Sequence, residues 1–168
     1  MPNSLSTMHT IMLLDDHEMV RQGIELGLVN EADFDVIGSY GTGTQLLEAL
    51  ARRPADIVVM DCILGQADID GLSLIRTLSR RFKKCKAIVV SSHYTPAMVS
   101  LALKAGSWGV LGKTQNLTEL ITAIRTVAQG KIYLQPCMLS ALQGVQPALD
   151  ASHPNSNVEL LSPLQLSA

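Results

Sequence analysis

Aromatic residues are scarce in this 168-residue sequence, which has one Trp, three Tyr and two Phe, or 4% of the chain. So few rings exclude a surface that binds single-stranded nucleic acid by stacking on its bases. Strong charge of one sign is also missing: the formal net charge is -2, which disfavours a strongly basic DNA-binding surface in this chain. Hydrophobic residues nevertheless make up 47% and charged residues 17%, so the chain has enough apolar material to fold.

Paired cysteines and long hydrophobic runs are absent as well. Cys62, Cys85 and Cys137 stand far apart with no CxxC spacing, so we expect reduced thiols and neither a disulfide framework nor a zinc site built on cysteine. No apolar stretch approaches the roughly 18 residues of a membrane helix, and residues 1–8 lack the pattern of a secretory signal. We therefore expect a soluble, cytoplasmic protein.

Short apolar runs alternate with amphipathic segments along most of the chain. The apolar runs predict strands at 10–14, 34–39, 57–60, 87–90 and 108–111. Apolar residues spaced three or four apart predict helices at 18–29, 46–53, 72–82, 96–105 and 116–130. Strict alternation requires a parallel sheet covered by helices on both faces. We predict a flavodoxin-like (βα)5 fold, a three-layer α/β sandwich with a five-stranded parallel sheet.

The composition changes after the last predicted helix. Residues 146–157 are rich in Pro, Ala, Ser and Asn, which is typical of a linker, and 134–145 are compatible with a short helix or an extended arm. The expected organisation is an N-terminal tail at 1–8, a folded domain at 9–130, a linker at 131–160 and, at 161–168, the start of a further domain that this chain does not contain.

Polar residues follow four of the five predicted strands. Asp15 and Asp16 end the first strand, Asp61 the third, Ser91 the fourth and Lys113 the fifth. The carboxyl ends of parallel strands meet at one edge of a sheet, where ligands bind in folds of this class. The sequence therefore predicts three carboxylates, a hydroxyl and an ammonium group in one pocket.

This combination of groups suits the chemistry of phosphoryl transfer. Neighbouring carboxylates repel one another, and Mg²⁺ relieves that repulsion by binding carboxylate, water and phosphate oxygens. Asp61 is suited to act as a nucleophile that forms an aspartyl phosphate, while Lys113 and Ser91 pair with the phosphoryl oxygens.

The same residues carry a resemblance to a known family. The motifs are Leu-Leu-Asp-Asp-His at 13–17, Val-Met-Asp at 59–61, Asp-Gly at 70–71, Val-Val-Ser at 89–91 and Leu-Gly-Lys at 111–113. In order and spacing, residues 10–130 resemble the receiver domain of bacterial two-component response regulators. Gly-Lys-Ile-Tyr-Leu-Gln-Pro at 130–136 resembles the segment that leaves this domain in the NarL/LuxR group, and Leu-Ser-Pro at 161–163 resembles the opening of that group's helix-turn-helix domain.

The resemblance implies a phosphorylation-dependent switch and no turnover enzyme. Asp61 would accept a phosphoryl group from a sensor histidine kinase or a phosphotransfer protein, with Ser91 as the switch hydroxyl and Lys113 as the lysine that pairs with the phosphate. Asp15, Asp16, Asp61 and the backbone carbonyl of Ile63 would bind Mg²⁺. The family also implies a homodimer, and DNA binding only through an output domain that this chain lacks.

Two departures from the family pattern keep other hypotheses open. The loop after Asp61 reads Leu-Gly at 64–65 where the family has Met-Pro, and it looks two residues longer; Val110 stands where a switch aromatic is expected. A phosphorylation-independent pseudo-receiver that acts as an interaction module is therefore one alternative. A Mg²⁺-dependent phosphatase is a second, disfavoured because the apolar Ile63 offers nothing to orient an attacking water.

Other candidate residues give weaker signals. Gly-Lys-Thr at 112–114 ends like a nucleotide-binding P-loop, but Ser107 replaces the glycine that such a loop requires. His17 is expected to be a solvent-facing or capping residue, and His93 to lie near the mouth of the pocket.

Overall fold

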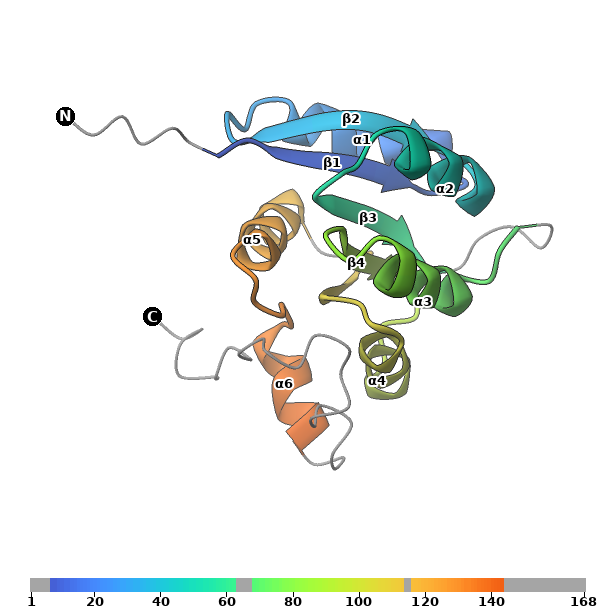
Figure 1. Ribbon diagram of the computed structural model, residues 1–168. Coiled ribbons are helices and arrows are strands. Elements are labelled where there is room, and N and C mark those ends of the chain that lie inside the picture. The colour runs from blue at the N-terminus through green and yellow to red at the C-terminus, as the bar shows by residue number, and fades with distance from the viewer. Residues whose placement is uncertain (1–6, 63–67, 114–115, 144–168) are drawn as a thin grey trace.

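A computed structural model describes residues 7–62, 68–113 and 116–143 of the chain. The strands are β1 (His9–Leu14), β2 (Phe34–Tyr40), β3 (Ile57–Asp61), β4 (Lys86–Ser91) and β5 (Gly109–Gly112). The helices are α1 (Glu18–Leu28), α2 (Gly43–Arg52), α3 (Gly71–Arg81), α4 (Pro96–Ala105), α5 (Leu117–Ala128) and α6 (Pro136–Gln143) (Figure 1). All strand pairs are parallel, in the order β2-β1-β3-β4-β5, which confirms the predicted flavodoxin-like fold.

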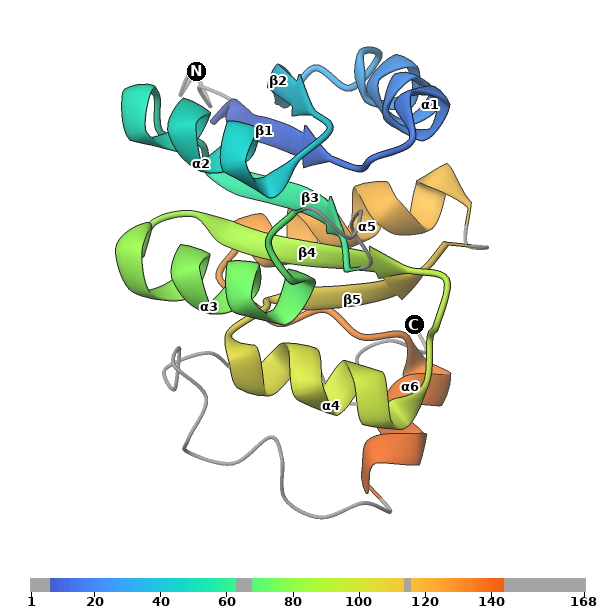
Figure 2. The ribbon, with the colours of Figure 1, turned by 90° about the vertical axis from the view of Figure 1, so that its right-hand side faces the viewer.

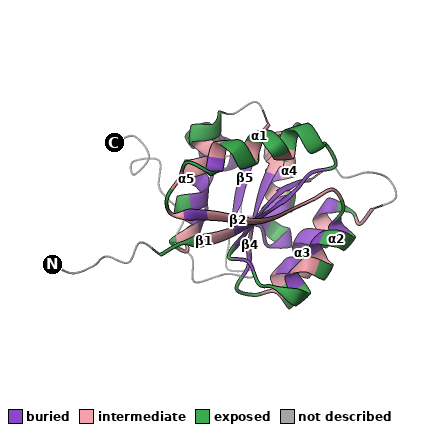
Figure 3. Ribbon diagram, turned by 90° about the horizontal axis from the view of Figure 1, so that it is seen from above, coloured by how far each residue is buried: buried purple, intermediate pink, exposed green. Residues whose placement is uncertain are grey.

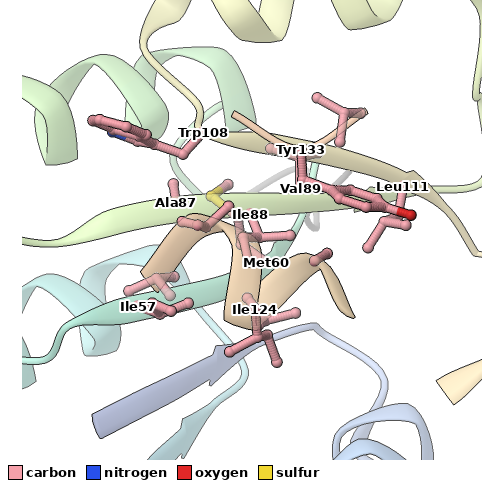
Figure 4. Packing of buried hydrophobic residues seen from close by; sticks show 14 of the residues in the cluster. Ile57, Met60, Ala87, Ile88, Val89, Trp108, Leu111, Ile124 and Tyr133 are labelled. Carbon is pink, nitrogen blue, oxygen red and sulfur yellow. The ribbon is translucent and has the colours of Figure 1, made fainter. Parts of the chain in front are cut away.

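The central strands are buried because helices cover both faces of the sheet. Figure 2 shows α2, α3 and α4 side by side in front of the sheet, with α5 behind it, and α1 contacts α5. Every residue of β3 is buried, and its first four residues form the unbroken apolar run expected of a central parallel strand. In Figure 3 the central strands are largely buried, the edge strand β2 is mostly half-buried, and the helices are exposed on their outer faces. Figure 4 shows how Ile88 from β4 packs near Ile124 from α5 in this core.

Polar side chains fix where several helices begin. The side chains of Thr42, Asp70, Thr95 and Asn116 accept hydrogen bonds from backbone N–H groups in the first turns of α2, α3, α4 and α5. Gly130, two residues beyond α5, has a φ of 80°, in the left-handed region that glycine adopts without strain. In the described part of the chain, no helix combines the length and the apolar character needed to cross a membrane.

The segment after α5 packs against the domain. The backbone N–H of Tyr133 donates to the Trp108 carbonyl at 2.9 Å, and the N–H of Val110 donates to the Tyr133 carbonyl at 3.3 Å, so this segment runs along the edge of β5. The helix α6 then contacts α4 and buries Met138 and Leu139. Of the two forms expected for residues 134–145, the described part forms a short helix. The domain boundary at residue 130 stays a prediction.

An ion-pair network joins the start of β2 to α5. The Arg125 guanidinium lies 3.0 Å from an Asp33 oxygen and 2.5 Å from a Glu31 oxygen. The hydrogen bond from Arg125 holds the pKa of Asp33 below its usual value. Because the groups are partly exposed, solvent screening keeps the contribution of this network to stability small.

Arg125→Gln should therefore lower the free energy of unfolding by less than about 1 kcal/mol at neutral pH. A carboxyl group whose pKa is lower in the folded than in the unfolded chain stabilises the fold at pH values above its pKa in the unfolded chain. This contribution is lost as the pH falls through its pKa in the folded protein. The difference between wild type and variant in urea unfolding should thus be constant near pH 7 and shrink below about pH 4. Arg76→Gln, at an exposed position of α3, is the control; a difference that grows in acid would contradict the assignment.

Candidate functional site

Four of the predicted site residues come together at the carboxyl ends of the strands. Asp15 and Asp16 follow β1, Asp61 is the last residue of β3, and Lys113 follows β5. Asp15 and Asp61 are buried, with 4% of their surface exposed, although both are acidic. Buried carboxylates require compensating charge or hydrogen bonds, and the neighbouring residues supply them.

Lys113 bridges the two buried carboxylates. Its Nζ lies 2.9 Å from Asp61 Oδ2 and 3.2 Å from Asp15 Oδ2. Burial alone would lower the pKa of Lys113, but the hydrogen bonds and charges of Asp61 and Asp15 outweigh it and hold the pKa above its usual value. Lys113 is therefore a permanent cation beside Asp61.

The loop between β1 and α1 holds Asp15 in place. The backbone N–H of His17 donates to Asp15 Oδ1 at 2.9 Å, and the Arg21 guanidinium donates to the backbone carbonyl of Asp15. Burial raises the pKa of Asp15, but hydrogen bonds from His17 and Lys113 more than offset this, so the pKa is lowered. The carboxylate is ionised at neutral pH and available to a cation.

The donor set at this edge fits a divalent metal ion. Asp15, Asp16, His17 and Asp61 each place one ligand atom within 4.8 Å of those of the other three. Several carboxylate oxygens in such proximity suit a hard divalent cation, which offsets their mutual repulsion. The predicted acidic pocket is thus present in the fold.

Of the two other predicted site residues, Ser91 is placed by the structure and Ile63 is not described. Ser91 is buried at the end of β4, next to the strand that carries Lys113, and its Oγ accepts a hydrogen bond from the backbone N–H of His93 at 3.1 Å. The backbone N–H of Lys113 donates to the Ser91 carbonyl at 2.8 Å, which ties the two strand ends together. Ile63, predicted to offer its carbonyl to the metal, lies outside the described residues, as do the Leu-Gly pair at 64–65 and Thr114.

The start of α3 closes tightly on the residue after Asp61. Gly71 lies so close to the Cys62 backbone that an added Cβ would meet the Cys62 carbonyl oxygen at 2.0 Å. Burial raises the pKa of the Cys62 thiol, which is consistent with a packing role and not with a reactive thiolate. Gly71 therefore determines how closely α3 approaches the strand that carries Asp61.

Sequence reasoning missed two features of this region. His17 was expected to face solvent or cap α1, and it does occupy the N-cap position, but its ring also contacts Asp15 and Asp16. Val110 is buried in β5 where an aromatic was expected, and Tyr94 packs instead over Gly112, two residues further along. The only signal for Tyr94 was its place three residues after Ser91.

Comparisons with known proteins point to one family. Residues 11–125 match the family model of the response regulator receiver domain. The transcriptional regulatory protein UhpA of Salmonella typhimurium is 40% identical over 129 residues, which cover 77% of this chain and 63% of UhpA. The chain thus spans less than two thirds of the length of this relative.

Solved receiver structures are similar in fold. The isolated REC domain of RcsB from Salmonella enterica serovar Typhimurium, solved with the phosphomimetic BeF3-, has a TM-score of 0.73 and 26% identity, covering 81% of this chain and 99% of that one. The signal receiver domain of a NarL response regulator from Mycobacterium tuberculosis has a TM-score of 0.69 and 25% identity, covering 74% of this chain and 99% of that one.

Proposed function

Since the chain belongs to the response regulator receiver domain family, we propose that it is the receiver of a two-component system and accepts a phosphoryl group on Asp61. The observation that carries the proposal is the placement of Lys113, whose ammonium bridges the buried carboxylates of Asp61 and Asp15 beside the acidic cluster. A structural lysine would not need two buried carboxylates as partners at the ligand-binding edge of the sheet.

The proposed donor is a phosphohistidine on a sensor kinase or a phosphotransfer protein. A carboxylate oxygen of Asp61 attacks the phosphorus, the new P–O bond forms, and the P–N bond breaks with its electron pair passing to the departing imidazole. Lys113 pairs with the phosphoryl oxygens, and the Ser91 hydroxyl donates a hydrogen bond to one of them. Mg²⁺, when bound by Asp15, Asp16 and Asp61, supplies positive charge that offsets the charge of the phosphoryl group. The Ile63 carbonyl stays a predicted additional ligand.

The domain would act as a switch and not as an enzyme with turnover. Each chain would take up one phosphoryl group and lose it slowly. Ile63, two residues after Asp61, has an apolar side chain that cannot orient a water molecule for attack on the phosphoryl group. A phosphatase of the same fold would instead consume many donor molecules per chain.

Intact mass after incubation with acetyl phosphate tests the proposal. We expect a gain of one phosphoryl mass with Mg²⁺ and little gain when the metal is removed with EDTA, because the clustered carboxylates then repel the donor. No gain in folded, Mg²⁺-loaded protein would contradict the proposal and favour the pseudo-receiver. Continuous release of phosphate would favour the phosphatase.

The proposed output is control of transcription, as the relative UhpA is named a transcriptional regulatory protein. We propose that it acts through a DNA-binding domain outside this chain. We propose that phosphorylation drives homodimerisation; the exposed apolar side chains of Met19 and Leu26 on α1, and of Val29 at its C-cap, support an interface along this helix. Light scattering on the phosphorylated sample measures the change in mass.

A cytoplasmic location is also proposed, supported by the three unpaired cysteine thiols.

A further inference from the structure

Charge is unevenly distributed along the chain and across the fold. Residues 9–70 contain twelve of the fifteen acidic residues and three basic ones, whereas residues 71–118 contain eight Lys or Arg and no Asp or Glu. In the sheet order β2-β1-β3-β4-β5, the first range supplies β2, β1 and β3, and the second supplies β4 and β5. The small net charge of the chain therefore conceals an acidic half and a basic half.

Five exposed cations gather where α3 ends and the chain turns back into β4. We call them the basic patch: Arg76, Arg80, Arg81, Lys83 and Lys84. Figure 2 shows the end of α3 at the edge of the sheet where the strands begin, opposite to the edge that carries Asp61 and Lys113. Lys104, also exposed, lies in the last turn of α4, which contacts α3 and ends at the same edge. The patch is thus remote from the candidate phosphorylation site.

Local structure explains only part of the basic patch. The negative end of the helix dipole favours cations in the last turn of a helix, and Arg80 and Arg81 occupy that turn of α3. Lys83 and Lys84 lie beyond the helix, and Arg76 lies one turn before Arg80, a spacing at which like charges repel. None of the five pairs with a carboxylate of the described residues, so no ion pair in that part of the chain relieves the repulsion.

The surroundings of the basic patch indicate the kind of partner. A protein interface normally has an apolar centre in which lysine is depleted, and a membrane-bound surface normally adds apolar side chains that enter the lipid. Residues 71–86 are all described, and none of the exposed large apolar side chains lies among them. Protein–DNA interfaces, by contrast, are polar and strongly positive. The patch therefore fits a polyanion that is bound by charge.

The aromatic rings beside the patch are covered by cations. The Arg81 guanidinium lies 5.5 Å from the centroid of the Phe82 ring, and Lys86 Nζ lies 5.2 Å from that of the Trp108 ring. Trp108 is also buried. Proteins that bind single strands stack the bases on exposed rings, whereas contacts with phosphates need only cations and carry no sequence information. These surroundings favour the backbone of a duplex.

We propose that the basic patch binds the phosphate backbone of double-stranded DNA without reading its sequence. The Lys and Arg side chains would replace counterions along the backbone, and their mutual repulsion would be relieved there. The choice of DNA among polyanions rests on the proposed transcriptional output. The contact would add sequence-independent affinity to that of a DNA-binding domain outside this chain.

Fluorescence anisotropy of a labelled DNA duplex of arbitrary sequence, titrated with the whole 168-residue chain, tests the proposal. We expect binding at about 50 mM salt that weakens as salt is added, with a log–log slope of about -0.9 for each phosphate contacted. The double variant Lys83→Gln/Lys84→Gln should bind at least about tenfold more weakly at that salt concentration, and the slope should become shallower by about 2.

The double variant Gln22→Glu/Gln45→Glu is the matched control. It lowers the net charge by the same amount, but through exposed residues of α1 and α2 in the acidic half. We expect it to bind the duplex within about twofold of wild type, because exposed charges beyond about 10 Å are screened by salt. Equal weakening in the two double variants would assign the binding to net charge and overturn the patch.

Three other results would overturn the proposal. The first is no binding of the duplex by folded wild type at about 50 mM salt. The second is tighter binding of a single strand of the same length. The third is binding to vesicles of phosphatidylglycerol and phosphatidylcholine but not to DNA, which would assign the patch to a membrane surface.

Failure of the proposed function would look different. Phosphoryl uptake from acetyl phosphate depends on Asp61, at the opposite edge of the sheet, so Lys83→Gln/Lys84→Gln should gain phosphoryl mass like wild type. Loss of DNA binding with intact uptake is the result expected of this variant. Wild type that binds DNA but gains no phosphoryl group would contradict the proposed function and leave the patch standing.

Discussion

The Asp61→Asn variant is expected to take up no phosphoryl group from acetyl phosphate under conditions in which wild type gains one. The amide has neither the charge nor the nucleophilic oxygen needed to form an acyl phosphate. The fold should survive, because Lys113 keeps its ion pair with Asp15 and the amide oxygen is still an acceptor for Lys113 Nζ. Intact mass measures the uptake, and circular dichroism checks the fold.

The control for this variant is Asp33→Asn. Asp33 is also an aspartate paired with a cation, Arg125, but it lies at the start of β2, away from the site. It should be phosphorylated like wild type. Undiminished uptake by folded Asp61→Asn would contradict the assignment of the acceptor, and peptide mapping would then show whether Asp15 or Asp16 carries the group.

The Gly71→Ala variant should be strongly destabilised and slow to accept a phosphoryl group. The new methyl would meet the carbonyl oxygen of Cys62 at 2.0 Å, and that atom belongs to the backbone, so the start of α3 or the end of β3 must move. Forcing extra volume into a packed region costs about 1–3 kcal/mol. Because Cys62 directly follows Asp61, the same movement displaces the acceptor. Urea unfolding and the rate of mass gain measure the two effects.

Gly23→Ala is the matched control for this substitution. Gly23 lies within α1, and an added Cβ would meet nothing within 4 Å. Alanine favours a helix over glycine by about 1 kcal/mol, so this variant should be more stable than wild type. If Gly71→Ala were equally well tolerated, the close approach of α3 to β3 would not control the site.

The parts of this protein that depend on periodicity were predictable from its sequence. The apolar run Ile57–Met60 predicts a strand buried on both faces, and strict alternation with amphipathic helices leaves a parallel sheet as the arrangement. The geometry of parallel sheets then requires Asp61 and Lys113 to meet, although 51 residues separate them. The structure places them in an ion pair.

Two features were not predicted from the sequence. One depends on the orientation of a side chain, and the other on backbone pairing by a segment whose residues show no strand-like alternation. The ring of His17 turns toward Asp15 because of the backbone angles at the N-cap and the hydrogen bond from the His17 N–H to Asp15 Oδ1. Neither produces a periodic pattern in the sequence. Residues 131–135 have no alternation of apolar and polar residues, yet Tyr133 pairs with β5. Both features follow from tertiary contacts that local propensity does not encode.

The pairing of Tyr133 with β5 also bears on aggregation. A strand at the border of a sheet offers unpaired N–H and C=O groups to strands of other molecules. The backbone of Tyr133 occupies these groups at Trp108 and Val110, and α6 then covers the neighbouring apolar surface of α4. A shortened chain ending at residue 130 would therefore present a bare strand next to the exposed apolar surface of α4. We therefore expect residues 131–143 to hinder the extension of the sheet into a second molecule, and a chain ending at residue 130 to aggregate more readily.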